Sequence, residues 1–281
     1  MTRGSVRLDG RELLGLDDKS MQSVRGARIA LVFQEPMAAL NPVLTLETQI
    51  CEAIRAHPAR LAGDRAGRVT RRAARLRALE LLELLAIPDP ESRLRSYPHQ
   101  LSGGQRQRAM LAIALAAGPE LLIADEPTTA LDVTLQAQVL DLLERLRREL
   151  NLAILLITHD LAVVAESCDR VLVMYAGEIV EAALANDLFG QPAHPYSRAL
   201  LASIPVLGHP APRGELPAIP GQVPAADRLP AGCAFQPRCS FAIDRCAVET
   251  PPWVAVAESV ETSHGARCLR LPELRAGEVR V

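Results

Sequence analysis

Residues 121–127 read LLIADEP: four apolar residues, two adjacent carboxylates and a proline. A bare apolar run of this length is typical of a strand buried on both faces of a parallel sheet. Two carboxylates at the end of a buried strand are costly unless they meet a cation or a polar ligand. Ligands bind at the carboxyl edge of such a sheet, where Asp125 can hold Mg²⁺ and Glu126 can orient an attacking water.

The residues on either side of this stretch continue the pattern. Short apolar runs recur at 29–33, 153–157 and 171–175, and helical patterns at 65–87 and 133–150 separate them. Short strands that alternate with amphipathic helices predict an α/β fold around a parallel sheet.

The sequence changes character after residue 190. Prolines recur from there to residue 252, and four of the six cysteines lie between 233 and 268. Because proline interrupts helices and central strands, we expect a separate, loop-rich module. The boundary near 190–205 predicts two domains, 1–190 and 191–281.

Composition excludes several classes of protein. The 281 residues are 49% hydrophobic and 23% charged, which is ordinary for a globular protein with a core. A net charge of −2 and an aromatic content of 3% give no reason to expect a nucleic acid as partner. The apolar run 109–117 is about half of what a bilayer crossing requires. Because residues 1–20 hold no signal-peptide pattern, we expect a cytosolic chain.

A second motif, LSGGQ at 101–105, precedes the carboxylates by twenty residues. It opens the helical pattern 105–117, so its two glycines let backbone N–H groups approach an anion at a helix N-terminus. Taken alone, it would be a turn followed by a helix cap. Its order before the carboxylates is what suggests a phosphate-binding role.

Four motifs in series resemble the ATP-binding cassette (ABC) transporter ATPases: VFQEP around Gln34, LSGGQRQR at 101–108, LLIADEPTTALD at 121–132 and ITHD at 157–160. Further segments are similar to the dipeptide, oligopeptide and nickel importers of that family. They are YPHQ at 97–100, VLVMYAGEIVE at 171–181, HPY at 194–196 and the tail GCAFQPRCSFAIDRC. The resemblance covers about residues 4–270.

The resemblance implies a P-loop NTPase-like (RecA-like) α/β core with a helical signature subdomain at about 42–117, incomplete at its N-terminus, and a small Pro/Cys-rich module. It implies that Asp125 serves Mg²⁺ and that Glu126 is the general base or the water-orienting residue. It also implies that Gln34 contacts Mg²⁺ or the attacking water, and that His159 contacts the γ-phosphate and holds the water. The residues implied to act on ATP across a dimer interface are Ser102, Gly103, Gly104, Gln105 and Asp132.

The family's P-loop, G-x-x-x-x-G-K-[ST], is missing from these residues. Lys19 is the single lysine, and Asp18 and Leu13 stand where that pattern requires glycine. We therefore expect the sequence to begin after the nucleotide cradle and to bind ATP poorly as written. Two explanations are open: a start site placed too late, or a chain that offers only its signature half-site to a partner's ATP.

The tail cysteines have unusual spacing. Cys233, Cys239, Cys246 and Cys268 do not match the spacing of common zinc sites. On spacing alone they are either a metal site or four unrelated small residues. The resemblance implies a [4Fe–4S] cluster, which some relatives hold. His264 could replace one ligand, although we expect it to be a solvent-exposed histidine.

We consider three functions for this sequence. The first is the ATP-hydrolysing subunit of a peptide-class importer at the cytoplasmic face of the inner membrane. Its partners would be a second ATPase subunit, two permeases and, indirectly, an extracytoplasmic solute-binding protein. The second is a non-hydrolysing assembly subunit. The third, a cassette protein acting in DNA repair or on ribosomes, has no supporting motif.

Overall fold

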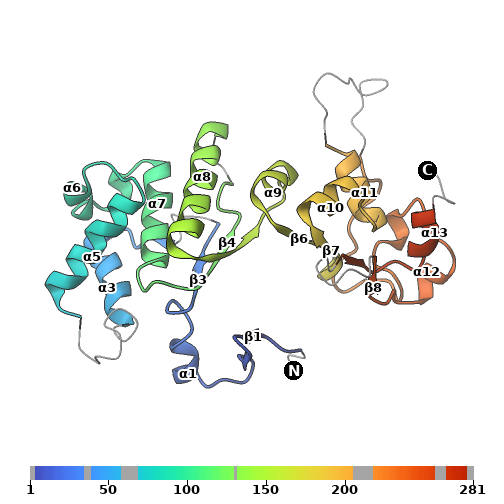
Figure 1. Ribbon diagram of the computed structural model, residues 1–281, viewed down its shortest axis with the longest axis horizontal. Coiled ribbons are helices and arrows are strands. Elements are labelled where there is room, and N and C mark those ends of the chain that lie inside the picture. Colours follow the sequence, from blue (N-terminus) through green and yellow to red (C-terminus); the bar gives the residue numbers. More distant parts are fainter. Residues whose placement is uncertain are drawn as a thin grey trace. The chain divides into compact units, whose positions relative to one another are not determined.

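The computed structural model describes residues 4–34, 39–57, 69–129, 132–204, 218–256 and 264–276. The chain forms two compact units, Met1–His159 (unit 1) and Asp160–Val281 (unit 2). Figure 1 shows their helices and strands in chain order, from blue to red. In the described part of the chain, no helix combines the length and the apolarity that crossing a membrane requires.

The centre of unit 1 is a parallel sheet of three strands, β3 (Ile29–Val32), β4 (Leu121–Asp125) and β5 (Ala153–Ile157). Their order is β3-β4-β5, with Ala124 paired to Val32 on one side and to Leu156 on the other. Because parallel strands in this register end together, the residues that follow them emerge at one edge of the sheet.

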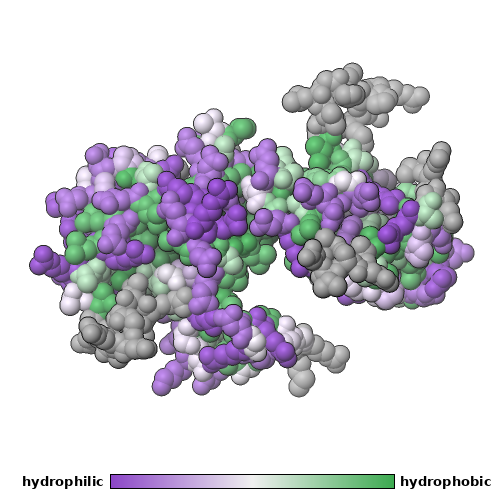
Figure 2. All heavy atoms as spheres, in the orientation of Figure 1, coloured by the Kyte–Doolittle hydropathy of each residue, from purple (hydrophilic) through white to green (hydrophobic). Residues whose placement is uncertain are grey.

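Helices flank this sheet and build most of the core. They are α3 (Leu46–Ala56), α5 (Arg71–Leu84), α6 (Pro90–Leu94), α7 (Gly103–Ala114) and α8 (Val133–Leu150), with a short 3₁₀ helix η1 (Pro98–Gln100) before α7. Fully buried leucines and isoleucines, among them Leu46, Ile50, Leu81 and Leu146, pack into one cluster. The outer face of α8 is polar, and Figure 2 shows hydrophilic residues gathered there, where Arg147 and Arg148 pair with Glu144.

Short elements precede this sheet. The chain begins with a small hairpin, β1 (Arg7–Leu8) and β2 (Arg11–Glu12), followed by α1 (Asp18–Gln22). Lys19 lies within α1, and Asp17 caps that helix by accepting from the Ser20 amide.

Unit 2 is built on an antiparallel sheet with the order β6-β7-β9-β8. Its strands are β6 (Arg170–Tyr175), β7 (Glu178–Leu184), β8 (Val254–Ala255) and β9 (Gly265–Ala266). Ala176 and Gly177 join β6 to β7 with positive φ angles of 48° and 85°, the backbone that favours a tight hairpin. The helical elements are α9 (Leu161–Ser167), α10 (Ala185–Gly190), α11 (Pro195–Ala202), η3 (Gln236–Arg238), α12 (Arg245–Val248) and α13 (Leu271–Ala276).

The two units divide at residues 159 and 160, whereas the sequence predicts a domain boundary near 190–205. The difference has a clear cause in the sheet of unit 2. Strand β7 pairs with β6 before it and with β9 near residue 265. The hairpin at 170–184 therefore belongs with the proline-rich residues that follow, although its apolar pattern resembles the strands of unit 1.

Candidate functional site

Three predicted site residues meet at the carboxyl edge of the sheet in unit 1. Gln34, Glu126 and His159 follow β3, β4 and β5 respectively. The Gln34 side-chain amide donates to Glu126 Oε2 at 2.8 Å. His159 Nδ1 lies 3.1 Å from Glu126 Oε1. The parallel register thus brings together side chains that are far apart in the sequence.

Glu126 is held by its own backbone as well as by these neighbours. Its φ is +45°, an uncommon value outside glycine, and its amide donates to the Ile157 carbonyl at 2.9 Å. The Thr129 hydroxyl donates to Glu126 Oε2 at 2.8 Å. A left-handed backbone at a non-glycine residue costs of order 1–3 kcal/mol and persists only where its surroundings fix it.

These hydrogen bonds also set the charge of Glu126. Donation from Thr129, followed by that from His159, lowers the pKa of the carboxyl group below its usual value. The side chain is 26% exposed, so it remains in contact with solvent. An ionised carboxylate beside water at a sheet edge can accept a proton. Because it only accepts hydrogen bonds, the proton of the contact with His159 belongs to Nδ1.

Asp125 is the last residue of β4 and is half-buried beside Glu126. Its carboxylate and the Gln34 amide oxygen are the hard oxygen ligands that Mg²⁺ takes. Magnesium is usually held by one or two carboxylates together with water and substrate phosphates. The residues at this edge therefore fit a magnesium ion that arrives with a nucleotide.

The signature residues begin α7. Ser102 is its N-cap, and its hydroxyl accepts from the Gln105 amide at 3.3 Å, while Gln105 Oε1 accepts from the Ser102 amide at 3.1 Å. This reciprocal capping box orders the first turn. A side chain at Gly103 would meet no atom within 4 Å, so the space before the helix is open.

Asp132 has a structural role that the sequence reading missed. It is the N-cap of α8 and accepts from the Leu135 amide at 2.9 Å. Leu135 in turn lies against Gly104, because a Cβ at Gly104 would be 3.5 Å from its side chain. The beginnings of α7 and α8 therefore adjoin. The two residues before Asp132 lie outside the described ranges.

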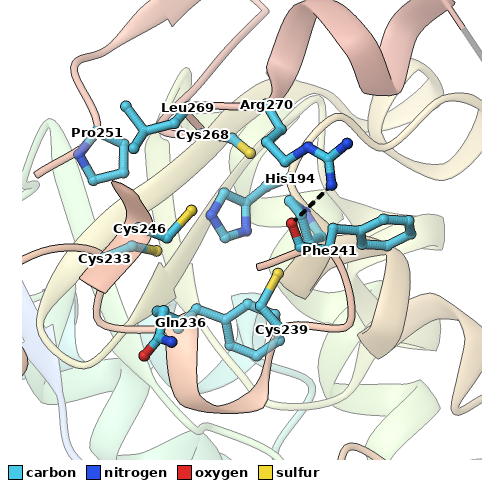
Figure 3. A pocket seen from close by; sticks show the side chains of 12 residues that line it. His194, Cys233, Gln236, Cys239, Phe241, Cys246, Pro251, Cys268, Leu269 and Arg270 are labelled. Carbon is cyan, nitrogen blue, oxygen red and sulfur yellow. Dashed lines mark hydrogen bonds between the residues drawn. The ribbon is translucent and has the colours of Figure 1, made fainter. Parts of the chain in front are cut away.

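The four tail cysteines line a single pocket of unit 2 (Figure 3). Burial raises the pKa of the Cys239 and Cys268 thiols to about 11, and it raises that of Cys233 as well. Within the described ranges, no group of three or more histidine, cysteine or acidic side chains is arranged to hold a metal ion. The four cysteines share the lining of this pocket with Phe241 and Arg270.

Two buried histidines of unit 2, His194 in the lining of this pocket and His264, have hydrogen-bond partners of their own. His194 Nδ1 accepts from the Tyr196 amide at 3.0 Å, and burial lowers its pKa to about 4, so the ring is neutral. The expectation that His264 is solvent-exposed is wrong. Its side chain is 6% exposed, and Nε2 lies 2.8 Å from the fully buried Glu181 carboxylate. That carboxylate also accepts from the Ala193 and His194 amides.

Comparison with known proteins gives the chain a family. The profile of ABC transporters matches residues 1–129, and that of the oligopeptide/dipeptide transporter C-terminal region matches residues 180–246. A probable peptide ABC transporter ATP-binding protein of Sinorhizobium fredii is 51% identical over 96% of this chain and 77% of its own length. The chain belongs to the peptide ABC transporter ATP-binding proteins. A putative peptide import ATP-binding protein of Brucella melitensis is 48% identical over 97% of this chain and 80% of its own length.

Solved structures confirm the predicted fold class for this ABC protein. A dimeric ATP-binding cassette bound to ADP and Pi is 31% identical, with a TM-score of 0.53 over 66% of this chain and 74% of that one. A cassette from Clostridium perfringens, described as part of an ABC transporter complex, is 25% identical, with a TM-score of 0.56 over 68% of this chain and 69% of that one.

The structure adds two residues to the site of this ABC protein. Thr129 donates to the Glu126 carboxylate, and the buried Gln107 side chain donates to the Pro127 carbonyl. The threonine stands three residues after the glutamate within a motif that was already noted, so the spacing could have indicated it. No sequence signal distinguishes Gln107 from its polar neighbours in α7, because its role depends on burial.

Proposed function

We propose that the chain is the ATP-hydrolysing subunit of a peptide-class importer. The observation that carries this proposal is the cluster at the sheet edge, where Gln34 and His159 both contact the ionised Glu126. A family member that only bound nucleotide would have no use for a base held in this way.

In this proposal, the site residues have different roles in hydrolysis. Asp125 and Gln34 hold Mg²⁺, which neutralises charge on the phosphates when it is bound. Glu126 accepts the proton of the attacking water, and His159 keeps the carboxylate oriented through Nδ1. Ser102, Gly103, Gly104 and Gln105 at the open end of α7 serve the ATP of the opposite subunit, with Asp132 beside them.

The proposal includes a cellular setting. Relatives are named as peptide import or peptide ABC transporter ATP-binding proteins. We infer a second ATPase subunit, two integral-membrane permeases and, through them, an extracytoplasmic solute-binding protein as partners. The chain would then sit peripherally at the cytoplasmic face of the inner membrane and bind no nucleic acid. Its transported solute would be a peptide, nickel or a related small solute.

Substitution of Glu126 tests the reaction. In the transporter purified with its partners from native membranes, Glu126→Gln should lower ATP turnover and solute uptake by about a hundredfold or more, because the base is lost. The control is Glu144→Gln, on the outer face of α8, which should turn over at the wild-type rate. Normal turnover by Glu126→Gln would overturn the proposal.

The same preparation distinguishes a hydrolysing subunit from the alternative, a non-hydrolysing assembly subunit. If Glu126→Gln is active but a bulky residue at Gly103 abolishes turnover, the chain only completes a partner's site. Co-purification with ribosomes in place of permeases would exclude both transporter readings. Normal turnover by both variants would exclude a role at either site.

We further propose that Cys233, Cys239, Cys246 and Cys268 hold a [4Fe–4S] cluster. The observation that supports this is that all four cysteines, distant from one another in the sequence, line one pocket of unit 2. Anaerobically purified protein should contain about four iron and four sulfide per chain. Cys239→Ser should lose them, whereas Cys168→Ser should retain them. Anaerobic protein free of iron, or containing zinc, would overturn this proposal.

A further inference from the structure

The helix that carries the signature is tied to the loop that carries Glu126 by one buried side chain. Gln107, on α7, is 2% exposed. Its side-chain amide donates to the carbonyl of Pro127, the residue directly after Glu126. A buried amide is costly to leave unpaired, so this contact fixes the distance between helix and loop.

The other polar residues of α7 point elsewhere. The Arg106 guanidinium donates to the Pro98 carbonyl at 2.9 Å, and Arg108 donates to the Ala86 carbonyl at 2.8 Å. Both arginines anchor the helix to the helical subdomain around it. Among the side-chain hydrogen bonds described for α7, that of Gln107 alone reaches the loop after β4.

The loop after β4, which begins with Glu126, requires contacts that hold its backbone in place. The left-handed backbone of Glu126 turns the chain sharply after β4, and the Thr129 amide closes the turn on the Glu126 carbonyl at 3.2 Å. Conformations of this kind hold only where several contacts oppose relaxation. On the strand side, the Glu126 amide is bonded to β5. On the helix side, the contact is Gln107.

We infer that Gln107 is a positioning residue for hydrolysis, which acts by holding the Glu126 loop against the signature helix. Because its side chain is buried against the Pro127 carbonyl, it acts through the loop. It sets where the Glu126 carboxylate stands relative to the first turn of α7, so that the base and the signature residues move as one piece. This inference rests on the proposed hydrolytic function and names the residue that couples its two halves.

The coupling explains why a glutamine is needed there. A side chain of this length reaches Pro127 from the helix, and an amide can donate, whereas a carboxylate would face the carbonyl oxygen without a proton. Gln107→Met keeps length and volume but removes the donor. The variant therefore tests the hydrogen bond with little change in packing.

Amide hydrogen exchange measures the tie directly. In the full chain, Gln107→Met should speed exchange at Glu126 and Thr129, whose amides close the turn, by about tenfold. The control is Leu142→Ala on α8, a buried core substitution remote from the loop. When the two variants have lost the same overall stability, the amides of Glu126 and Thr129 should exchange more slowly in Leu142→Ala than in Gln107→Met. Equal rates in the two variants would overturn the inference.

Turnover in the assembled transporter measures the consequence. Displacement of a base by a fraction of an ångström to an ångström can cost about a hundredfold, so Gln107→Met should lower kcat by about tenfold to a hundredfold with KM within about twofold. Leu142→Ala should keep the wild-type kcat per folded protein. A wild-type kcat for Gln107→Met would overturn the inference, and so would a fall that only tracks the folded fraction.

Glu126→Gln separates this inference from the function on which it rests. If Glu126→Gln is inactive and Gln107→Met turns over normally, Gln107 has no positioning role but the proposed function stands. If Glu126→Gln is active, the proposed function itself fails, whatever Gln107→Met does.

Discussion

Glu126 in unit 1 and the cysteines Cys239 and Cys268 in unit 2 are site residues whose pKa values are shifted in opposite directions. Hydrogen bonds lower the pKa of Glu126, which favours its charged form. Burial raises the pKa of both thiols to about 11, which favours their neutral form. The Glu126 carboxyl group of unit 1 is therefore held in its charged form, whereas the Cys239 and Cys268 thiols of unit 2 are held in their neutral form.

This difference shows two ways of preparing a site. At the sheet edge, donors from Gln34, Thr129 and His159 stabilise a negative charge before any ligand arrives, so little reorganisation is needed. In the cysteine pocket, burial outweighs the backbone hydrogen bonds from Phe241 to Cys239 and from Arg270 to Cys268, so the thiols remain neutral until a ligand binds. Occupation of unit 2 is therefore expected to change its stability far more than nucleotide chemistry changes that of unit 1.

The largest expected effect concerns the buried carboxyl group of Glu181 in unit 2. Glu181→Leu removes the acceptor of two backbone amides and of His264. Because groups of a broken buried pair are left unpaired, the free energy of unfolding should fall by about 3–5 kcal/mol. Urea unfolding followed by fluorescence of Trp253, the single tryptophan, measures unit 2 alone.

The matched control for this substitution is Glu178→Leu, at the exposed start of the same strand. It should change stability by less than about 1 kcal/mol. An equal loss in the two variants would mean that strand propensity, not the buried carboxylate, stabilises the sheet.

A second experiment tests the neutral thiols. At pH 8 without a bound cluster, alkylation of Cys239 and Cys268 should be about a hundredfold slower than in the urea-unfolded chain. The reason is that the thiolate fraction falls about tenfold for each unit by which the pKa, about 11, exceeds the usual thiol pKa of 9.0. Mass spectrometry of the labelled peptides measures both rates.

The same shift gives a pH dependence of stability. Because the folded thiols keep their protons to higher pH than the unfolded ones, their contribution is complete below pH 9 and is lost as the pH rises to about 11. Unit 2 should therefore unfold more easily across this range. If the folded thiols are alkylated as fast as the unfolded ones, and the stability of unit 2 does not change with pH, their pKa values are not raised. The contrast with the lowered pKa of Glu126 would then be wrong.

The smallest expected effect concerns the cap of α7. Ser102→Ala removes the hydroxyl that accepts from the Gln105 amide and should lower the stability of unit 1 by about 1 kcal/mol. Circular dichroism of urea unfolding measures it. The exposed Ser92, inside α6, provides the control, because Ser92→Ala removes no cap. Equal effects would show that the capping box does not order the signature turn.

Much of the fold could be predicted from local sequence. The apolar runs at 29–33, 121–124 and 153–157 correspond to β3, β4 and β5, because short bare runs suit strands covered on both faces. Serine, threonine or aspartate at helix starts marks several N-caps, including Thr45 and Thr70. The family motifs also predicted which side chains stand at strand ends. The proposed roles of those side chains on ATP await the experiments above.

Other features depend on contacts between distant residues. The hydrogen bond from Gln34 to Glu126 spans 92 residues, the pair His264–Glu181 spans 83, and Gln107 reaches Pro127 across 20. Local sequence does not reveal which polar side chain will be buried against which backbone group, because burial is set by the packing of whole elements.

The sequence by itself determined the kinds of element, the caps and the chemistry available at each strand end, since these depend on neighbouring residues along the chain. Only the tertiary structure decided that the hairpin at 170–184 joins the C-terminal unit, that His264 is buried and that the Gln107 side chain donates to the Pro127 carbonyl. Each of these follows from strand pairing and close packing, in which a residue's partner is chosen by its position in space.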